Sequence, residues 1–312
     1  MTDVSLIVPA YNAEETLPAL LTSVESQDLP PHQYEVLVVD DGSTDASASL
    51  VHEHRNVRLL SQSNRGPGAA RNLGARHALG KIIVYTDADC RLPPDFLSQH
   101  ARLHALHPEV DGIAGAVAPA TSLPLASAVL ADHLCNWFNA HDRLPPRAPE
   151  YMWGANMSVN RRVLEAGIRW SEERITGEDV DFCSQMNALG MSLRFFPECF
   201  VRHTDRASLS GFLRHQYNWG FHAPFVRGRN PQAAYSFMFP THLGRATLLS
   251  PAVALGYTAL VARGWWRYRP LGLLSVLPLI LLGKVAYARG VLEGTRVILE
   301  KSRRRIADRR TA

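Results

Sequence analysis

The sequence of 312 residues predicts an α/β fold, a doubly wound and mostly parallel sheet followed by a C-terminal helical segment. In the first half, short apolar runs alternate with segments of helical periodicity, which is the pattern of successive strand–helix units. After Tyr235 the alternation stops and long charge-free runs take its place. The composition, 46% hydrophobic and 20% charged, excludes disordered, collagen-like and coiled-coil proteins.

Four short apolar runs are predicted to be strands, and the first two, which lack polar alternation, are predicted to be buried in a parallel sheet. They lie at 4–10, 34–39, 57–60 and 81–86. The first helix is expected after Asn12, its predicted N-cap, with apolar residues at helical spacing from Leu17 to Val24. Further helices are predicted after the acidic turn 40–45 and over 69–79. Ligands of such a sheet bind at the carboxyl ends of its strands.

The pattern from 111 to 203 is less regular. It predicts strands at 111–118 and 192–196, the second leading to His203. Helices are predicted over 122–140, near 161–166 and from the loop 176–179 to about Leu189. A proline-rich break at 144–149 interrupts the sequence of elements.

The C-terminal segment differs from the rest in charge. Residues 1–235 include 20 basic and 26 acidic residues, whereas 236–312 include 13 and 3. We therefore predict two domains, an α/β domain over 1–235 and a membrane-associated domain of hydrophobic helices with a basic tail over 236–312. A nucleic-acid-binding protein would carry its basic residues on the folded domain, so nucleic acid is not an expected partner.

The two apolar runs of this segment are 246–262 and 270–283, and the second reaches 288 if Lys284 snorkels to the membrane surface. Both are near or below the roughly 20 residues that span a bilayer. The connector 263–269 is aromatic and basic, as at headgroup level. A transmembrane hairpin, helices lying in the membrane plane and buried helices of a soluble domain all remain open.

The N-terminus has neither a basic region nor an apolar run long enough for a signal peptide. The four cysteines show no CxxC pair and no zinc-ligand spacing, which favours free thiols in a reducing compartment. We therefore expect the α/β domain to face the cytoplasm at the inner (plasma) membrane.

Three acidic clusters stand at predicted strand ends or at the start of a helix: Asp40 with Asp41, Asp87 with Asp89, and Glu178 with Asp179. Two carboxylates one residue apart suit Mg²⁺ or Mn²⁺, which completes its shell with substrate phosphates. Each cluster alone is as well explained by a turn or a helix cap. Three of them together favour one shared charged ligand.

Several segments recur in a specific order: VSLIVPAYNAEETL, EVLVVDDGSTD, NRGPGAARNLGARHALGKIIVYTDAD, GANMSVNRRV, and TGEDVDFCSQMNALG followed by PECFVRH. In this order and spacing the chain resembles the family 2 glycosyltransferases of the GT-A fold over about residues 4–225. The resemblance implies a GT-A type sheet and metal-dependent, inverting transfer of a sugar from a nucleoside diphosphate to an acceptor.

The resemblance also implies roles for individual residues. The implied donor-binding residues are Pro9, Tyr11, Glu14, Asp40, Asp41, Asp87, Gly154 and Asn156. The implied ligands of Mg²⁺ or Mn²⁺ are Asp89, Asp87 and His203, the first two forming the DxD motif. Asp179 is implied as general base and Glu178 as a group that orients the acceptor. Asp41 is expected to accept the imide proton of uracil, which implies a UDP-sugar donor.

Several roles stay open. Asp40 either shares the role of Asp41 or braces the turn, and Arg71 and Asn72 either brace the acidic turn or reach the donor. Gln216 and Trp219 are expected at the acceptor, because the segment 214–219 resembles the QxxRW segment of processive membrane synthases. Asn218 replaces the arginine of that motif, which counts against polymerisation.

The implied acceptor is a membrane-borne lipid or lipid-linked glycan, in the synthesis of an envelope polysaccharide or glycolipid. Two alternatives remain: a polyprenyl-phosphate glycosyl synthase, and a non-catalytic nucleotide-binding membrane scaffold. A dinucleotide fingerprint at 66–71 is disfavoured, since its third glycine is missing and it follows the third strand.

Overall fold

The computed structural model describes residues 2–54, 56–121, 127–173, 176–228, 239 and 242–311, without the side chains of 302–311. The chain forms two compact units. The first, here the sheet unit, comprises Met1–Ser122 and Ala140–Thr204; the second, the helical unit, comprises Leu123–Asn139 and Asp205–Ala312. The boundary therefore differs from the predicted one at 235/236, because residues 123–139 and 205–235 group with the C-terminal helices.

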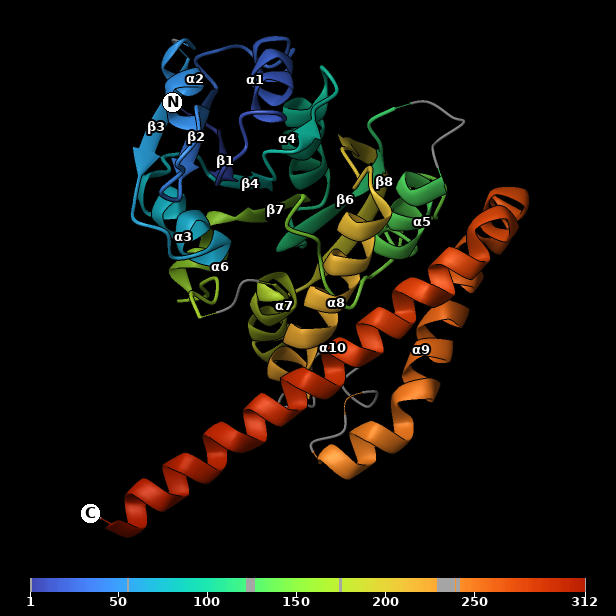
Figure 1. The fold of residues 1–312 in the computed structure, drawn as a ribbon. Coiled ribbons are helices and arrows are strands. Elements are labelled where there is room, and N and C mark those ends of the chain that lie inside the picture. Colours follow the sequence, from blue (N-terminus) through green and yellow to red (C-terminus); the bar gives the residue numbers. More distant parts are fainter. Residues whose placement is uncertain are drawn as a thin grey trace. The chain divides into compact units, whose positions relative to one another are not determined.

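The sheet unit is built on one mixed sheet of eight described strands in the order β3-β2-β1-β4-β7-β6-β8-β5 (Figure 1). The strands are β1 Val4–Ala10, β2 Tyr34–Asp40, β3 Val57–Ser61, β4 Ile82–Thr86, β5 Cys90–Arg91, β6 Gly112–Pro119, β7 Asn156–Asn160 and β8 Leu193–His203. Only β7 and β5 pair antiparallel with their neighbours, so the prediction of a mostly parallel sheet is confirmed.

Helices of the sheet unit fill the connections between these strands. They are α1 Leu17–Glu25, α2 Ser47–His52, α3 Pro67–His77, α4 Phe96–Leu106, α6 Arg161–Glu165 and α7 Glu178–Ala188. α3 packs on β1 and β2, while α4 packs on β4, β6 and β8. Leu6, Ile7 and Leu37, which have no exposed surface, belong to the apolar core beneath these helices.

The prediction that Asn12 caps the first helix is wrong. The helix begins at Leu17 after Thr16, and Asn12 instead adopts a left-handed φ of 47°. Its Oδ1 accepts a hydrogen bond from the amide of Thr44 at 2.8 Å. Asn12 thus joins the ends of β1 and β2, a long-range contact that local capping rules do not consider.

Other elements are longer than predicted or were not predicted. β8 continues through Pro197 to His203, with a register shift against β6 between Gly115 and Ala116 that accommodates the irregularity. Helix α4, helix α8 (Leu209–Val226) and strands β5 and β7 had no sequence prediction. The predicted helix over 122–140 is observed as α5 (Ser127–Asn136), and residues 122–126 lie outside the described part of the chain.

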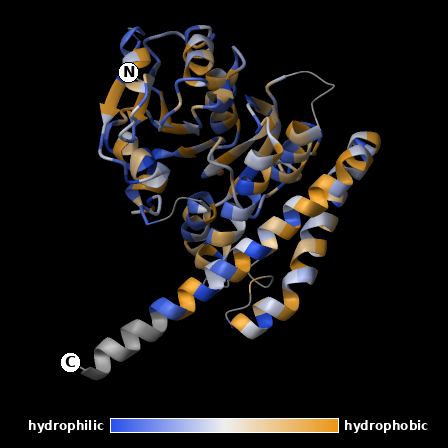
Figure 2. Cartoon of the chain, in the orientation of Figure 1, coloured by the Kyte–Doolittle hydropathy of each residue, from blue (hydrophilic) through white to orange (hydrophobic). Residues whose placement is uncertain are grey.

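The helical unit consists of α5 Ser127–Asn136, α8 Leu209–Val226, α9 Leu243–Trp266 and α10 Pro270–Thr311. Figure 2 shows hydrophobic residues recurring along α9 and the N-terminal half of α10. A buried cluster joins Leu130 and Leu134 of α5 to Val261 of α9 and to Leu273 and Ile280 of α10. Among the described residues, two helical segments are long and apolar enough to cross a membrane, Leu243–Trp266 and Pro270–Lys301; an 18-residue window in each has a mean hydropathy of 1.3 and 1.9, respectively.

The side chain of Lys284 does not snorkel. It is 2% exposed, and its Nζ donates a hydrogen bond to Oε1 of Gln216 on α8 at 2.7 Å. Gln216 in turn donates from Nε2 to Oδ1 of Asn136 on α5 at 3.1 Å. This chain of buried polar groups joins α10, α8 and α5, and it begins at the lysine that directly follows the predicted apolar run 270–283.

Candidate functional site

Two of the three acidic clusters lie where β2 and β4, the parallel neighbours of β1, end. Ala10 and Asp40 are paired in register at the ends of β1 and β2, and the amide of Asp41 donates to the carbonyl of Ala10 at 2.8 Å. β4 ends at Thr86, so Asp87 follows directly. The site is therefore at the carboxyl edge of the sheet, as the strand pattern predicted.

Asp41 holds the loop that leads into α3. Its Oδ1 accepts hydrogen bonds from Nε2 of Gln62 at 2.7 Å and from the amide of Arg65 at 2.8 Å. Its Oδ2 accepts from the amide of Gly66 at 2.8 Å, and the residue is 3% exposed. Asp40 accepts from the amide of Ser43 at 3.1 Å, which is the bracing role foreseen as one of its two alternatives.

The other predicted donor residues at the ends of β1 and β2 differ in exposure. Tyr11 is half exposed, while Pro9 lies within β1 opposite Val39. Oε2 of Glu14 accepts from the amide of Ala46 at 3.0 Å, and the amide of Glu14 donates to Oδ2 of Asp45 at 3.1 Å. Glu14 thus braces the start of α2, and Tyr11 is the exposed group beside it.

Asp89 and His203, two of the three predicted metal ligands, are brought together. Nε2 of His203 is 3.4 Å from Oδ2 of Asp89, with the histidine side chain 5% and the aspartate side chain 28% exposed. Their backbones are held by the short β5–β8 pairing, in which Cys90 lies opposite His203. Because this pairing joins residues more than a hundred positions apart, the sequence alone could only suggest it by resemblance.

Arg71 is the centre of the acidic edge. Its Nη2 donates to Oδ1 of Asp87 at 2.7 Å and its Nη1 donates to Oε1 of Glu178 at 2.8 Å. The guanidinium is nearly buried and lies 4.5 Å above the ring of Trp170. Of the two roles left open for Arg71, the geometry supports bracing, and the acids it braces come from β4 and from α7.

Burial and charge set the protonation of this group. Burial raises the pKa of Glu178, and the Arg71 guanidinium lowers it. The effect of burial is larger, so the pKa is raised to about 7. The same two carboxylates raise the pKa of Arg71 above its usual value, despite burial, so Arg71 stays charged. A buried arginine between two carboxylates is therefore the fixed positive charge of the edge.

Asp179 follows Glu178 at the start of α7. Gly177 precedes the helix with a φ of 77°, a left-handed conformation that glycine adopts without strain. Oδ1 of Asp179 accepts from the amide of Val180 at 2.7 Å. The positive end of the helix dipole favours the ionised carboxylate there. Asp179 is partly exposed, unlike its buried neighbour Glu178.

Gly154 and Asn156 serve the protein interior. A Cβ on Gly154 would lie 2.7 Å from Nη2 of Arg71, so the absence of a side chain makes room for the guanidinium. Asn156 has no exposed surface, and its Nδ2 donates to the carbonyls of Ala116 and Cys199 at 2.8 and 3.0 Å. With its amide engaged inside the sheet, we do not retain Asn156 among the proposed donor contacts.

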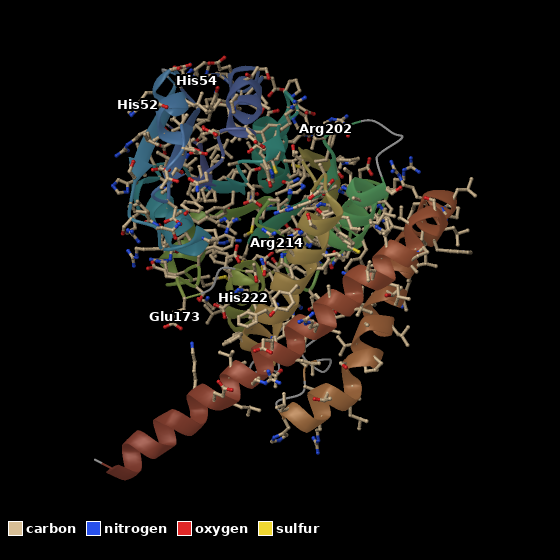
Figure 3. The ribbon with its side chains drawn as sticks, viewed as in Figure 1. His52, His54, Glu173, Arg202, Arg214 and His222 are labelled. Atoms are coloured by element: carbon tan, nitrogen blue, oxygen red, sulfur yellow. The ribbon has the colours of Figure 1, made fainter. Side chains whose placement is uncertain are left out.

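Gln216 and Trp219 belong to the helical unit, on α8, where Figure 3 labels Arg214 and His222. Gln216 is fully buried between Asn136 and Lys284. The ring of Trp219 meets that of His215 edge-on, with centroids 4.8 Å apart. Gln216 therefore has a structural role in this unit, and an acceptor role for Trp219 stays a prediction.

Two of the three predicted metal ligands, Asp89 and His203, lie together at the edge, and Asp87 is turned to Arg71. Among the residues that the structure describes, no three His, Cys, Asp or Glu side chains converge on one point. Mg²⁺ is commonly held by one or two carboxylates plus substrate phosphates and water, so Asp89 would supply the carboxylate, with His203 beside it. Asp87 has one oxygen on Arg71, which leaves its second oxygen for a metal-bound water or a ribose hydroxyl.

Comparison with known families agrees with the residue-level resemblance. The family described as Glycosyl transferase family 2 matches residues 5–124, and the one described as Glycosyl transferase family group 2 matches residues 82–288, more than half of the chain. The chain belongs to the family 2 glycosyltransferases. It is accordingly a glycosyltransferase with a GT-A type fold.

Among curated relatives of this glycosyltransferase is the poly(ribitol-phosphate) beta-N-acetylglucosaminyltransferase TarS of Staphylococcus aureus. It is 39% identical over 94 residues, which are 28% of this chain and 16% of TarS. A Methanococcus voltae relative, the dolichyl N-acetyl-alpha-D-glucosaminyl phosphate 3-beta-D-2,3-diacetamido-2,3-dideoxy-beta-D-glucuronosyltransferase, is 22% identical over 70% of this chain and 72% of its own. The matched stretch is thus a small part of TarS and most of the archaeal enzyme.

Solved structures show the same fold. The S. aureus TarS 1-349 complex with UDP-GlcNAc has a TM-score of 0.56 at 18% identity, covering 95% of this glycosyltransferase and 92% of that chain. The mannosyltransferase PcManGT of Pyrobaculum calidifontis, in complex with GDP-Man and Mn²⁺, has a TM-score of 0.59 at 21% identity, covering 93% and 86%. At these identities the likeness concerns the fold.

Sequence reasoning missed Trp170 and underestimated Asn72. The side chain of Asn72 donates to the carbonyl of Trp170 at 2.9 Å and accepts from its amide at 3.0 Å. Trp170 carries Arg71 on its face and stacks on Phe182 at 4.7 Å. The only sequence signal for this contact was a tryptophan shortly before the acidic start of α7. No known motif fixes the spacing between such a tryptophan and the helix, so its contact with Arg71 could not be predicted.

Proposed function

We propose that this glycosyltransferase moves a sugar, with inversion at C1, from a UDP-sugar to a hydroxyl of a membrane-borne lipid or lipid-linked glycan, with Mg²⁺ or Mn²⁺ as cofactor. The observation that carries the proposal is the joining of three acidic positions at one sheet edge. Asp87 and Glu178 share Arg71, while Asp89 lies 3.4 Å from His203.

Asp89 and His203 would hold the cation beside the donor diphosphate. When bound, a divalent cation supplies positive charge that stabilises the departing phosphate oxygen. Arg71 does not replace it in this role, because its side chain is only 3% exposed and its charge is shared between Asp87 and Glu178. Its function is to hold the two acids at fixed positions while the donor binds.

Uridine recognition is proposed for Asp41. A carboxylate has about four acceptor positions, and Asp41 uses three of them for the loop 62–66. One position remains for the imide N–H of uracil, a donor that cytosine lacks. The half-exposed ring of Tyr11, at the end of the adjacent strand, is available to pack against the base.

Asp179 is proposed as the general base that takes the proton of the acceptor hydroxyl. It is partly exposed at the helix N-terminus, where the ionised form is favoured, whereas Glu178 is buried with a pKa of about 7. These two adjacent carboxyls differ in environment, as acid–base and positioning groups commonly do. Glu178 is therefore assigned to positioning, through Arg71.

The membrane-borne acceptor and a cytoplasmic location at the inner membrane are proposed from α9 and α10, whose apolar segments keep the enzyme near a lipid surface. The M. voltae relative is named for a dolichyl-phosphate-linked sugar, which supports an acceptor of this kind. A polyprenyl phosphate acceptor would already be ionised and would need no base. The dependence of the rate on Asp179 separates the two.

The test is release of UDP by the purified full chain from a panel of UDP-hexoses, with Mn²⁺ and added lipid extract. We expect turnover that EDTA abolishes, and a loss of about 10²–10⁴ in kcat for Asp179→Asn, the usual contribution of a general base. Asp181→Asn, also in the first turn of α7, is the matched control. If Asp179→Asn kept nearly full activity, Asp179 would not be the general base, and a phosphate acceptor, which needs none, would be favoured.

A further inference from the structure

α9 and α10 carry a row of large apolar side chains that the helical unit leaves uncovered. We call it the outer face; it comprises Leu248, Leu249, Leu255, Trp266, Leu271, Leu274, Leu281, Leu282 and Val285. Leu248 and Leu271 are 79% and 82% exposed, which is unusual for leucine on a soluble protein. Contiguous exposed apolar residues of this kind mark an interaction surface.

The outer faces of the two helices point away from one common core. Val261 and Trp265 of α9 and Val276 of α10 pack with Leu134 of α5 in a single buried cluster. α10 packs on α8, α5 and α9, and α9 packs mainly on α10, so the exposed leucines lie on the sides that these contacts leave uncovered. The result is an amphipathic pair of helices with a wide apolar surface.

Basic residues frame this surface. Residues 243–292 include five arginines and no acidic residue. Arg245 and Arg263 lie near the ends of α9, and Arg267 and Arg289 flank the apolar part of α10; all four are exposed. A surface that is apolar in its centre and positive at its rim is complementary to a bilayer with anionic headgroups.

The connector end of the pair contains a hollow suited to a headgroup. It has a volume of about 310 Å³ and is lined by Ala262, Arg263, Trp266 and Arg267. Arg263 and Arg267 are one helical turn apart, so their guanidinium groups reach the same space. Arginine pairs bind phosphate oxygens in fork geometry, and tryptophan is enriched at the headgroup level.

We propose that α9 and α10 lie in the plane of one leaflet, with the outer face in the acyl boundary and Arg263, Trp266 and Arg267 around an anionic headgroup phosphate. The proposal concerns how the chain contacts lipid and does not depend on which sugar is transferred. It chooses one of the three arrangements that the apolar runs left open.

A transmembrane hairpin conflicts with the connectivity of the chain. Nε1 of Trp265, at the connector end, donates to the carbonyl of Leu134 at 3.0 Å, and a Cβ on Gly264 would lie 2.3 Å from the carbonyl of Phe138. Phe138 is two residues before Ala140, which belongs to the sheet unit. Two residues reach about 7 Å, whereas a spanning hairpin would place its connector about 30 Å across the bilayer.

The groups packed beneath the connector end are also unsuited to hydrocarbon. Asp132 of α5 is fully buried and accepts from the amide of Arg206 at 3.0 Å, and His133 is 2.8 Å from Asp205. The segment 204–208 that supplies these partners is not helical, and its residues 207 and 208 are exposed. Irregular exposed backbone does not occur in the lipid core, so this end must remain at the membrane surface.

The first test measures binding of the full chain to phosphatidylcholine vesicles with and without phosphatidylglycerol. We expect binding to the anionic vesicles that weakens with salt. Leu248→Glu and Leu271→Glu should each weaken it about tenfold, the scale for one apolar side chain withdrawn from an apolar environment. The control is Leu79→Glu, a 70% exposed leucine of the sheet unit. If all variants bound the vesicles equally well, the outer face would not be the surface that contacts lipid.

Arg263→Gln combined with Arg267→Gln tests the headgroup site. We expect this variant to lose most of its preference for anionic over neutral vesicles, while the retained leucines preserve residual binding. An unchanged preference would refute the headgroup site. Release of UDP from a soluble UDP-sugar should be unaffected in every variant, so failure of the lipid proposal and failure of the transferase proposal are distinguishable.

The second test determines the side of the membrane on which the connector lies. All four native cysteines are buried, so Arg267→Cys introduces a distinct thiol. In sealed cytoplasm-out vesicles, a membrane-impermeant maleimide should label Arg267→Cys as readily as His52→Cys, which marks the sheet unit and is exposed. Labelling of Arg267→Cys only after detergent would show that the connector crosses the bilayer and would overturn the proposal.

Discussion

Arg71 holds two acids of the candidate site in place. It is 3% exposed, joins Asp87 to Glu178, and lies on the face of Trp170. Its position requires Gly154, where any Cβ would meet the guanidinium. The absence of a side chain at 154 thus makes room for the arginine, while the donor-binding role of Gly154 stays a prediction.

Replacing Arg71 should damage both stability and activity. In Arg71→Met, two carboxylates lose their common cation, and breaking a buried ion pair from one side costs about 3–5 kcal/mol. We expect a urea midpoint well below that of the parent and little UDP release. Arg76→Met, at the exposed end of the same helix, is the control. If Arg71→Met and Arg76→Met were equally stable, the ion pairs of Arg71 with Asp87 and Glu178 would not contribute to stability.

At the scale of elements, α8 and α10 touch backbone to backbone. A Cβ on Gly220 would lie 1.9 Å from the carbonyl of Tyr287, and one on Gly290 would lie 2.2 Å from the carbonyl of Tyr217. Glycines on both helices therefore set the distance at which Lys284 reaches Gln216. The packing of the helical unit therefore depends on the close approach of the α8 and α10 backbones as well as on the burial of apolar side chains.

Gly220→Ala should separate these helices. A methyl group directed at backbone cannot be relieved by a rotamer change, and overpacking costs about 1–3 kcal/mol. Thermal unfolding should therefore begin at a lower temperature. Gly244→Ala makes the same change where a Cβ meets nothing within 4 Å, and it should leave the melting curve unchanged or raise it. If Gly220→Ala and Gly244→Ala melted at the same temperature, the close contact between the backbones of α8 and α10 would not determine the stability of this unit.

Sequence patterns located most strands of the sheet unit, because a short run of apolar residues is a signal that can be recognised without knowing the fold. The run 4–10 is the strand Val4–Ala10, and 34–39 falls within Tyr34–Asp40. β7 was missed because Ser158 and Asn156 interrupt its apolar run while pairing with buried histidines. α4 was missed with it, since those histidines, His100 and His104, make its buried face look polar.

At the scale of the whole molecule, these buried histidines predict acid sensitivity. Oδ1 of Asn156 can only accept, so His100 donates from Nε2 and accepts from Ser158 at Nδ1; His104 then donates to Ser158. Both rings are therefore neutral. Burial lowers the pKa of His100 to about 4 and that of His104 to about 3.

The sign of the pH dependence follows from proton binding. Below the unfolded value of about 6.5 the unfolded chain binds protons that the native histidines exclude, so each lowers the free energy of unfolding by about 1.4 kcal/mol per pH unit. This stability is present above pH 6.5 and is lost toward pH 4. Glu178, with a raised pKa of about 7, acts oppositely and loses its contribution as the pH rises from about 4.5 to 7.

Urea unfolding between pH 7.5 and pH 4.5 tests this balance. Because two histidines oppose one carboxyl, we expect a net fall in the free energy of unfolding as the pH drops below about 6.5. His104→Gln keeps a donor toward Ser158 without titrating, so its slope should be shallower by about one proton. His52→Gln, at an exposed position, should keep the parent slope; a parent-like slope in His104→Gln would contradict the assignment.

By itself the sequence determined the class of fold, the family and the acidic residues, because strand burial, turn chemistry and motif order are local properties of the chain. It also determined that 243–292 is apolar and positive without acids. Only the tertiary structure decided that Arg71 joins Asp87 to Glu178, that Asn156 is closed inside the sheet, and that Lys284 points inward. These depend on which distant segments share a face, and no short window of sequence contains that information.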